Sequence, residues 1–222
     1  MSRPAFVIGI LGAESSGKTQ LALDLERRLR AAGVDALAVA EHLREFCDRH
    51  HRTPRRDEQA AIAAEQTQRI AQAAARHAVV VADTTALMTA IYSEIVFGDT
   101  SLYAGVEAAQ RRCDLTLLMA LDLPWQADGL QRDGAHVREP VDALVRATLA
   151  RIGQPFVVVA GQREARLHAA WRAVRHAFTL PAEADAEEGG DDTSLTTWHT
   201  RCERCGDANC ERHLLPRSLA RD

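Results

Sequence analysis

The sequence predicts a three-layer α/β domain with a mainly parallel, five-stranded sheet. Strand-like apolar segments recur along the chain, and stretches with apolar residues at helical spacing separate them. Strands that are almost entirely apolar and alternate with helices are typical of a parallel sheet covered on both faces. The expected strands are Ala5 to Leu11, Val34 to Ala40, Val79 to Ala82, Leu115 to Leu121 and Phe156 to Ala160.

The chain is expected to divide into three segments. Residues 1–178 carry the strand and helix pattern and form the α/β domain. Residues 179–196 are rich in Asp, Glu and Gly, and they hold too few large apolar side chains to offset the entropy of ordering, so we expect a flexible linker. Residues 197–222 form a short tail rich in cysteine.

Composition excludes several classes of protein. Of the 222 residues, 46% are hydrophobic and 26% are charged, which is typical of a globular protein and not of a fibrous or disordered one. The longest apolar runs are too short to span a bilayer, and the N-terminus shows no signal peptide, so we expect a cytoplasmic protein with no membrane partner.

Charge gives no general attraction to nucleic acid, because the net charge is −4. One local basic cluster consists of Arg49, Arg52, Arg55 and Arg56. It is either a solvated loop or a patch that steers anions.

A phosphate-binding loop follows the first expected strand. The pattern G-x-x-x-x-G-K-[ST] is fitted by Gly12, Ala13, Glu14, Ser15, Ser16, Gly17, Lys18 and Thr19. Such a loop points backbone N–H groups at the phosphates of ATP, while Lys18 bridges the β- and γ-phosphates and Thr19 binds Mg²⁺. Lys18 is the only lysine in the chain, which fits the need for a compact ammonium there.

Acidic residues follow two further strands. Asp83 is expected to hold Mg²⁺ or to accept a substrate proton, although it could instead cap the next helix together with Thr84 and Thr85. Glu41 and Arg44 follow the second strand, where they either face a substrate or lie on the surface.

A polar segment after the fourth strand is expected to form a lid over the phosphates. Arg132 and Arg138 are its candidate charge-stabilising arginines. Asp122, Trp125 and Asp128 are assigned to the substrate side, and Trp125 either stacks on a substrate ring or packs beneath the lid.

Together these segments, over about residues 5 to 177, resemble the ribosylnicotinamide kinase domain of NadR-type proteins and the related P-loop ATPases. The resemblance implies transfer of the ATP γ-phosphoryl group to the 5′-hydroxyl of nicotinamide riboside, which gives the mononucleotide. Glu41 or Asp83 is then the carboxylate that orients the hydroxyl. Two features depart from the family pattern: Arg132 lies one residue late in the lid, and the cysteine-rich tail is extra.

Two other functions fit the same phosphate-binding residues. The chain could be a kinase for another metabolite, or a nucleotide-switched ATPase or GTPase whose tail contacts a protein partner. ATP is favoured over GTP because the guanine-binding motif Asn/Thr-Lys-x-Asp does not occur in the chain.

The tail carries a candidate zinc site. Cys202, Cys205, Cys210 and His213 form two short ligand pairs, and four such ligands suit a closed, structural, tetrahedral Zn²⁺ site. His199 could replace His213, and a tail with free thiols is the alternative. Cys47 and Cys113 are expected to be packing residues of the main domain.

Overall fold

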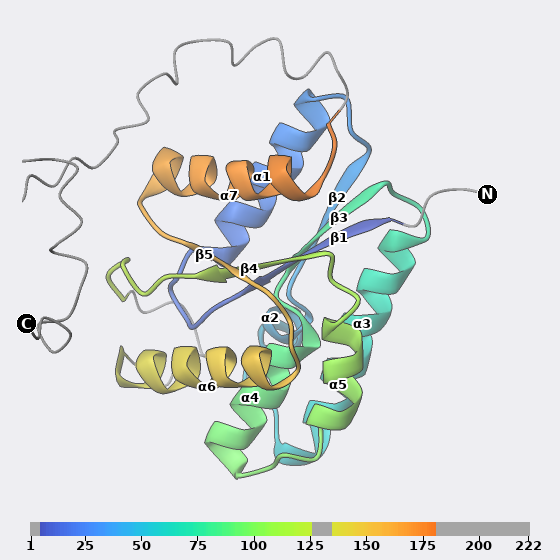
Figure 1. Ribbon diagram of the computed structural model, residues 1–222. Helices are drawn as coiled ribbons and strands as arrows, with labels where there is room; N and C mark the ends of the chain where they lie inside the picture. The colour runs from blue at the N-terminus through green and yellow to red at the C-terminus, as the bar shows by residue number, and fades with distance from the viewer. Residues whose placement is uncertain (1–4, 126–134, 181–222) are drawn as a thin grey trace, which may run out of the picture. The chain divides into compact units, whose positions relative to one another are not determined.

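The fold is a five-stranded parallel sheet between two layers of helices, as predicted (Figure 1). The computed structural model describes residues 5–125 and 135–180, which lie in one compact unit, Met1–Ala184. The strand order is β2-β3-β1-β4-β5, and every neighbouring pair is parallel. The strands are β1 (Phe6–Leu11), β2 (Ala36–Val39), β3 (Val79–Asp83), β4 (Leu115–Met119) and β5 (Val157–Val159).

The strands differ from the expected ranges mainly at their ends. The second strand loses Val34 and Asp35, because the Asp35 carbonyl turns to accept the N–H groups of Ala78 and Val79. The fourth strand ends at Met119, before the chain bends at Leu121 and Leu123. Asp83 is the last residue of β3 and not the residue after it.

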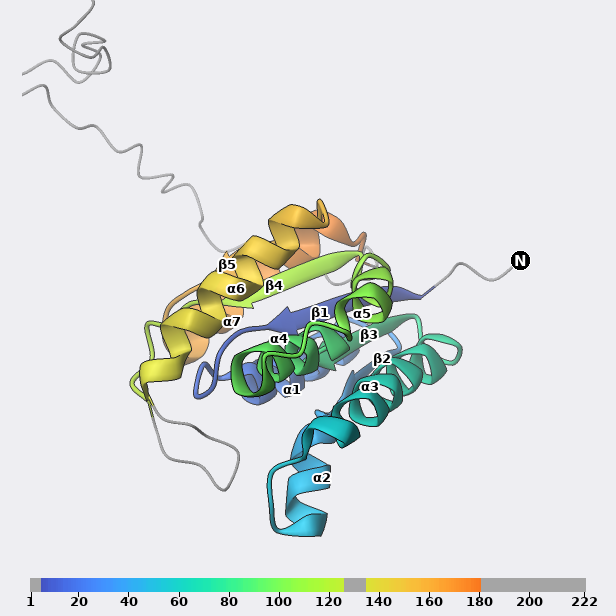
Figure 2. The ribbon, with the colours of Figure 1, turned by 90° about the horizontal axis from the view of Figure 1, so that it is seen from below.

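Helices cover both faces of the sheet (Figures 1 and 2). One layer holds α1 (Lys18–Ala31) and α7 (Arg163–Ala177). The other layer holds α3 (Gln59–Ala74), α4 (Ala86–Phe97), α5 (Tyr103–Gln110) and α6 (Arg138–Arg151). Helix α2 (His42–His50) follows β2 and packs against α3, and the short 3₁₀ helices η1 and η3 span Arg56–Glu58 and Ala135–Val137.

Burial of both sheet faces stabilises this arrangement. On one face, strand residues such as Ile8 and Leu117 pack with Leu25 of α1 and Trp171 of α7. The opposite face packs against a second cluster that includes Leu87 and Ile91 of α4 and Val145 of α6. Each fully buried side chain of this size contributes about 1.5–3 kcal/mol, so the two clusters hold the sheet edges in place for the site.

Local sequence sets the limits of α4, which follows the Asp83 strand. Thr85 caps its N-terminus, because the Thr85 hydroxyl accepts the N–H of Leu87 at 3.3 Å. Gly98 ends the helix at φ 63°, a left-handed conformation that glycine adopts readily.

Several sequence-based predictions lie outside the described residues: the acidic linker, the zinc ligands Cys202, Cys205, Cys210 and His213, and the lid residues Asp128 and Arg132. Within the described residues, no helix is long and apolar enough to cross a bilayer. Cys47 and Cys113 are buried, in agreement with the prediction that they are packing residues.

Gly12 is predicted to be intolerant of any side chain. Its φ is +149°, and a Cβ atom there would lie 2.9 Å from Cβ of Met119. We expect Gly12→Ala to lower the free energy of unfolding by the roughly 1–3 kcal/mol of an overpacked core, in addition to backbone strain.

Gly33, at φ +75°, is the matched control, because a Cβ atom there would meet no described atom within 4 Å. Gly33→Ala should show only the strain, about 1–2 kcal/mol, in urea unfolding. Equal losses at both positions would contradict the prediction.

Candidate functional site

The candidate site lies at the carboxyl edge of the sheet, where β1, β3 and β4 end side by side. Parallel pairing places Ile10 beside Asp83, and Leu11 beside Leu118. The loop after β1 therefore begins between the end of β3 and the end of β4. Ligands of open parallel sheets bind at this edge.

The loop itself is curled as the sequence pattern predicts. Gly12, Ser15 and Gly17 have positive φ angles of 149°, 53° and 82°, and α1 begins directly afterwards at Lys18. The Lys18 ammonium donates to the carbonyls of Gly12 at 2.9 Å and Ala13 at 3.0 Å. The loop thus holds its lysine folded over its own backbone, beside the N-terminus of a helix, which is a favourable place for an anion.

Asp83 lies next to this loop and is almost completely buried, at 3% exposure. Burial raises the pKa of the Asp83 carboxyl, while a hydrogen bond with the Thr19 side chain and the positive charges of Lys18 and Arg44 oppose that rise. Its Oδ1 atom has no hydrogen-bond partner among the described residues. A carboxylate and a threonine hydroxyl in contact, with a spare buried oxygen, fit the hard oxygen ligands that Mg²⁺ prefers.

A cavity of about 350 Å³ opens beside the loop, between α2, the segment from Thr53 to Gln59, and α4. Glu14, Glu41 and Arg44 line it, together with Tyr92 and Phe97. The structure therefore brings together Glu41 and Arg44, which were predicted to face a substrate. Glu14, which the sequence pattern indicated only as part of the phosphate-binding loop, also lines this cavity.

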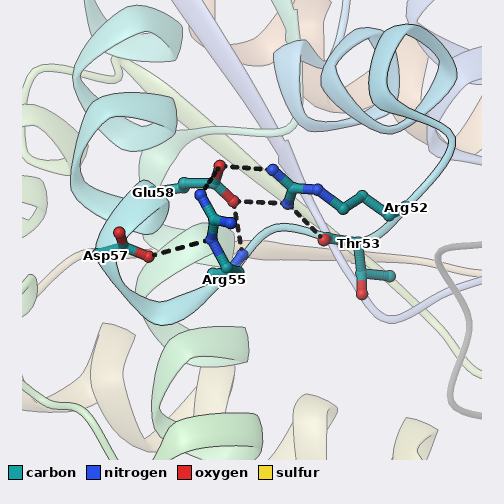
Figure 3. Close-up of polar contacts among 5 residues, drawn as sticks. All are labelled: Arg52, Thr53, Arg55, Asp57 and Glu58. Atoms are coloured by element: carbon teal, nitrogen blue, oxygen red, sulfur yellow. Dashed lines mark hydrogen bonds and ion pairs between the residues drawn. The ribbon is translucent and has the colours of Figure 1, made fainter.

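The basic cluster of residues 49–56 is largely neutralised by ion pairs that shape the cavity wall (Figure 3). Arg52 donates two hydrogen bonds of 2.7 Å to the Glu58 carboxylate, and Arg55 adds one of 3.1 Å. The bonds from Arg52 and from the Arg55 backbone lower the pKa of Glu58 to about 2. Arg56 pairs with Asp99 at 3.0 Å. These ion pairs leave less unpaired positive charge to steer anions, so of the two interpretations they favour the solvated loop.

Asp122, predicted to contact substrate, is engaged within the protein. Its carboxylate pairs with Arg166 of α7 and accepts the N–H of Gly161 at 2.6 Å. Arg166 is 5% exposed and donates to the carbonyls of Gly161 at 2.7 Å and Ser16 at 2.5 Å. This arginine, which no sequence motif indicated, therefore ties the phosphate-binding loop to the ends of β4 and β5. A buried arginine in an amphipathic helix leaves no signal in the sequence that separates it from the exposed ones.

Arg138 and Trp125 lie close to the same edge. Arg138 is 7% exposed and donates to the carbonyl of Leu123 at 2.9 Å. Leu123 lies near Gly17, because a Cβ atom added to Gly17 would be 3.3 Å from Cδ1 of Leu123. The Nε and Nη2 atoms of Arg138, and Nε1 of Trp125, are buried and have no partner among the described residues. A partner is expected for each of these donors, because a buried polar group is normally hydrogen-bonded.

A family model described as an AAA domain matches residues 7–166. The chain belongs to this AAA domain family. The match covers the phosphate-binding loop, Glu41, Asp83 and Arg166, so the candidate site lies wholly within the AAA domain. A search of curated proteins finds no match.

Solved structures with the same fold include two of NadR proteins. One, in complex with NAD and AMP-PNP, has a TM-score of 0.63 and 21% identity, over 80% of this chain and 50% of that chain. The other, in complex with NR, has a TM-score of 0.61 and 20% identity, over 80% of this chain and 52% of that chain. The resemblance to the NadR-type kinase domain is thus confirmed at the level of the fold. This chain spans about half the length of each NadR chain.

A deoxyadenosine kinase from M. mycoides, with the products dCMP and dCDP bound, is also similar. Its TM-score is 0.54 with 13% identity, over 77% of this chain and the whole of that chain. Identities at this level show a shared fold alone.

Within the described part of this AAA domain, there is no cluster of three or more His, Cys, Asp or Glu side chains that could hold a metal ion.

The buried carboxylate of this AAA domain is predicted to lower its stability. Because the folded-state pKa of Asp83 is raised, ionisation costs stability; the full cost is present above the folded-state pKa and is lost as the pH falls through it towards the ordinary pKa of Asp. We expect Asp83→Asn to raise the thermal midpoint at pH 7 without Mg²⁺, and the gain to shrink as the pH is lowered through the folded-state pKa of Asp83. The same variant should lose Mg²⁺-dependent nucleotide binding.

Asp35→Asn is the matched control, with the opposite expected sign. The hydrogen bond with His77 lowers the pKa of Asp35, so its ionised form stabilises the fold above its ordinary pKa. The prediction is wrong if Asp83→Asn and Asp35→Asn shift the midpoint in the same direction at pH 7.

Proposed function

We propose that this chain is an ATP-dependent phosphotransferase that phosphorylates the 5′-hydroxyl of nicotinamide riboside or a similar nucleoside. The observation that carries the proposal is the cavity of about 350 Å³ beside the phosphate-binding loop, with Glu14, Glu41 and Arg44 on its wall. Pockets that hold small ligands start at about this volume. A nucleotide on the loop therefore has space for an acceptor next to it, which favours a kinase over a nucleotide-switched ATPase. The similarity in fold to NadR structures in complex with NAD and NR supports the choice of a nucleoside acceptor.

The two candidate carboxylates take different roles in this proposal. Asp83 is in contact with Thr19 and does not line the cavity, so these two residues are assigned to Mg²⁺, which supplies charge neutralisation at the phosphates. Glu41 lines the cavity at the N-terminus of α2, so it is assigned to orient the acceptor hydroxyl and take its proton.

Positive charge for the transferring group comes from two side chains. Lys18 lies on the loop itself and exchanges its hydrogen bonds with the Gly12 and Ala13 carbonyls for bonds with phosphate oxygens. The Nε and Nη2 donors of Arg138 are buried and have no partner among the described residues. We assign them to bind the phosphoryl group during transfer. Arg132 and Asp128 remain candidates from the sequence, outside the described residues.

Purified protein with ATP and Mg²⁺ should convert nicotinamide riboside to its 5′-monophosphate, as measured by mass spectrometry. Lys18→Ala should lower turnover by roughly 10²- to 10³-fold, the cost of losing one preorganised charge. Glu41→Gln should lower kcat by roughly 10²-fold or more, since it removes the base. Arg27→Ala, on the exposed side of α1, is the control that leaves turnover unchanged.

Three outcomes separate the alternatives. A phosphorylated product from another metabolite, with none from nicotinamide riboside, would show that the chain is a kinase with a different acceptor. Slow hydrolysis that rises only with a protein partner would point to a nucleotide switch. Full activity of Lys18→Ala would remove the phosphate-binding loop from the chemistry.

For the tail we retain the sequence-based proposal of one structural zinc ion on Cys202, Cys205, Cys210 and His213. Four protein ligands leave no open position for substrate, so removal of the metal should leave nucleotide binding intact. Metal analysis of protein purified without added zinc should give about one zinc per chain. Zinc retained by the double variant Cys202→Ser with Cys205→Ser would contradict this ligand set.

A further inference from the structure

Two buried glutamines lie in the same helical layer, and each accepts one hydrogen bond and donates another. Gln66 of α3 is 3% exposed, and Gln110 of α5 is 1% exposed. A primary amide can accept and donate at the same time, so each side chain can join two groups of opposite polarity.

Gln66 joins the chain segments that follow β2 and β3. Its Oε1 accepts the backbone N–H of His42 at 2.8 Å, and its Nε2 donates to the backbone carbonyl of Thr84 at 3.0 Å. His42 opens α2, so its N–H has no acceptor within the helix. His42 directly follows Glu41, and Thr84 directly follows Asp83. One amide therefore bridges the backbones next to both candidate carboxylates.

Thr84 is a residue that needs such support. It has a φ of +77°, which is unfavourable for a β-branched side chain, and it is 3% exposed. Backbone conformations of this kind persist where the surrounding structure holds them in place. The bond from Gln66 holds the Thr84 carbonyl, and with it the direction in which the chain leaves Asp83.

We infer that Gln66 is a positioning residue that sets the placement of Glu41 relative to Asp83 and thereby aligns the acceptor hydroxyl with the phosphoryl group. This inference rests on the proposed function for its catalytic consequence. Gln66 does not line the cavity, so it acts through the two backbone segments and not through contact with substrate.

Gln110 provides a matched control inside the same helical layer. Its Oε1 accepts the Thr85 hydroxyl at 2.7 Å, and its Nε2 donates to the Thr116 hydroxyl at 3.1 Å. It joins two groups, as Gln66 does, in an equally buried place. Both glutamines bind the segment that follows Asp83, but Gln110 does so through the Thr85 side chain and not through the backbone. The second partner of Gln110 is on β4 and not beside Glu41. Gln66→Met and Gln110→Met remove the same chemical groups at nearly constant volume.

The test measures kcat, KM for ATP and KM for nicotinamide riboside, together with the thermal midpoint. Gln66→Met should lower kcat by roughly 10- to 100-fold with KM for ATP changed less than about threefold, because displaced reacting groups slow the chemical step. Gln110→Met should lower the midpoint to a similar extent and leave kcat within about threefold of the parent. Equal losses of kcat in both variants would overturn the inference.

A second measurement keeps this test independent of the acceptor. If the parent protein phosphorylates no riboside, the proposed function fails, and the inference is judged by Mg²⁺ titration of the binding of a fluorescent ATP analogue. Gln66→Met should weaken the Mg²⁺ dependence by about tenfold, since Asp83 shifts with Thr84, whereas Gln110→Met should not. If Gln66→Met does not fold, Gln66→Glu replaces it, measured at a pH high enough to ionise the buried carboxyl group. The carboxylate keeps the bond from His42 and loses the bond to Thr84. An unchanged Mg²⁺ dependence in the folded variant would refute the positioning role.

Discussion

The parallel pairing of β1 with β3 is the constraint on which the candidate site depends. Register places Ile10 beside Asp83, so the phosphate-binding loop leaves the sheet next to a buried carboxylate. A slip of one residue would exchange the faces on which all the side chains of a strand lie. Both strands are buried on both sides, in clusters that include Ile8, Ile10 and Val81. Core packing therefore fixes the distance between the phosphate-binding loop and the Asp83 carboxylate.

At the carboxyl edge of the sheet, two features of the candidate site lower the stability of the fold. Asp83 has its pKa raised by burial, and Thr84 has a φ that a β-branched residue avoids. Both features cost folding free energy, and the surrounding core compensates for them. Hydrogen bonds from Thr19 and Gln66 then hold the strained segment in one conformation. Such preorganisation suits the proposed phosphoryl transfer, because catalysis of that reaction consists mostly of positioning and electrostatics.

The arginines discussed above differ in whether their guanidinium groups are paired within the protein. Arg52 and Arg55 hold Glu58 and so shape the wall of the cavity (Figure 3). Arg166 donates to three acceptors and ties the loop to the sheet edge. The planar fork of a guanidinium suits these multiple contacts, whereas the single lysine lies where a compact charge is needed. Arg138 differs from them, because its Nε and Nη2 atoms have no partner among the described residues.

Local patterns in the sequence were enough to predict the parallel α/β fold, the phosphate-binding loop and the strand-end positions of Glu41 and Asp83. These patterns are the period of apolar residues, and glycines at fixed spacing before a lysine. The packed chain was needed to show that Asp83 contacts Thr19 while Glu41 lines the cavity with Glu14, and that Asp122 pairs with Arg166. It also revealed Gln66 and Arg166, which are 24 and 150 residues from partners they bind. Contacts over such separations depend on the order of strands and the packing of helices, and no local spacing encodes them.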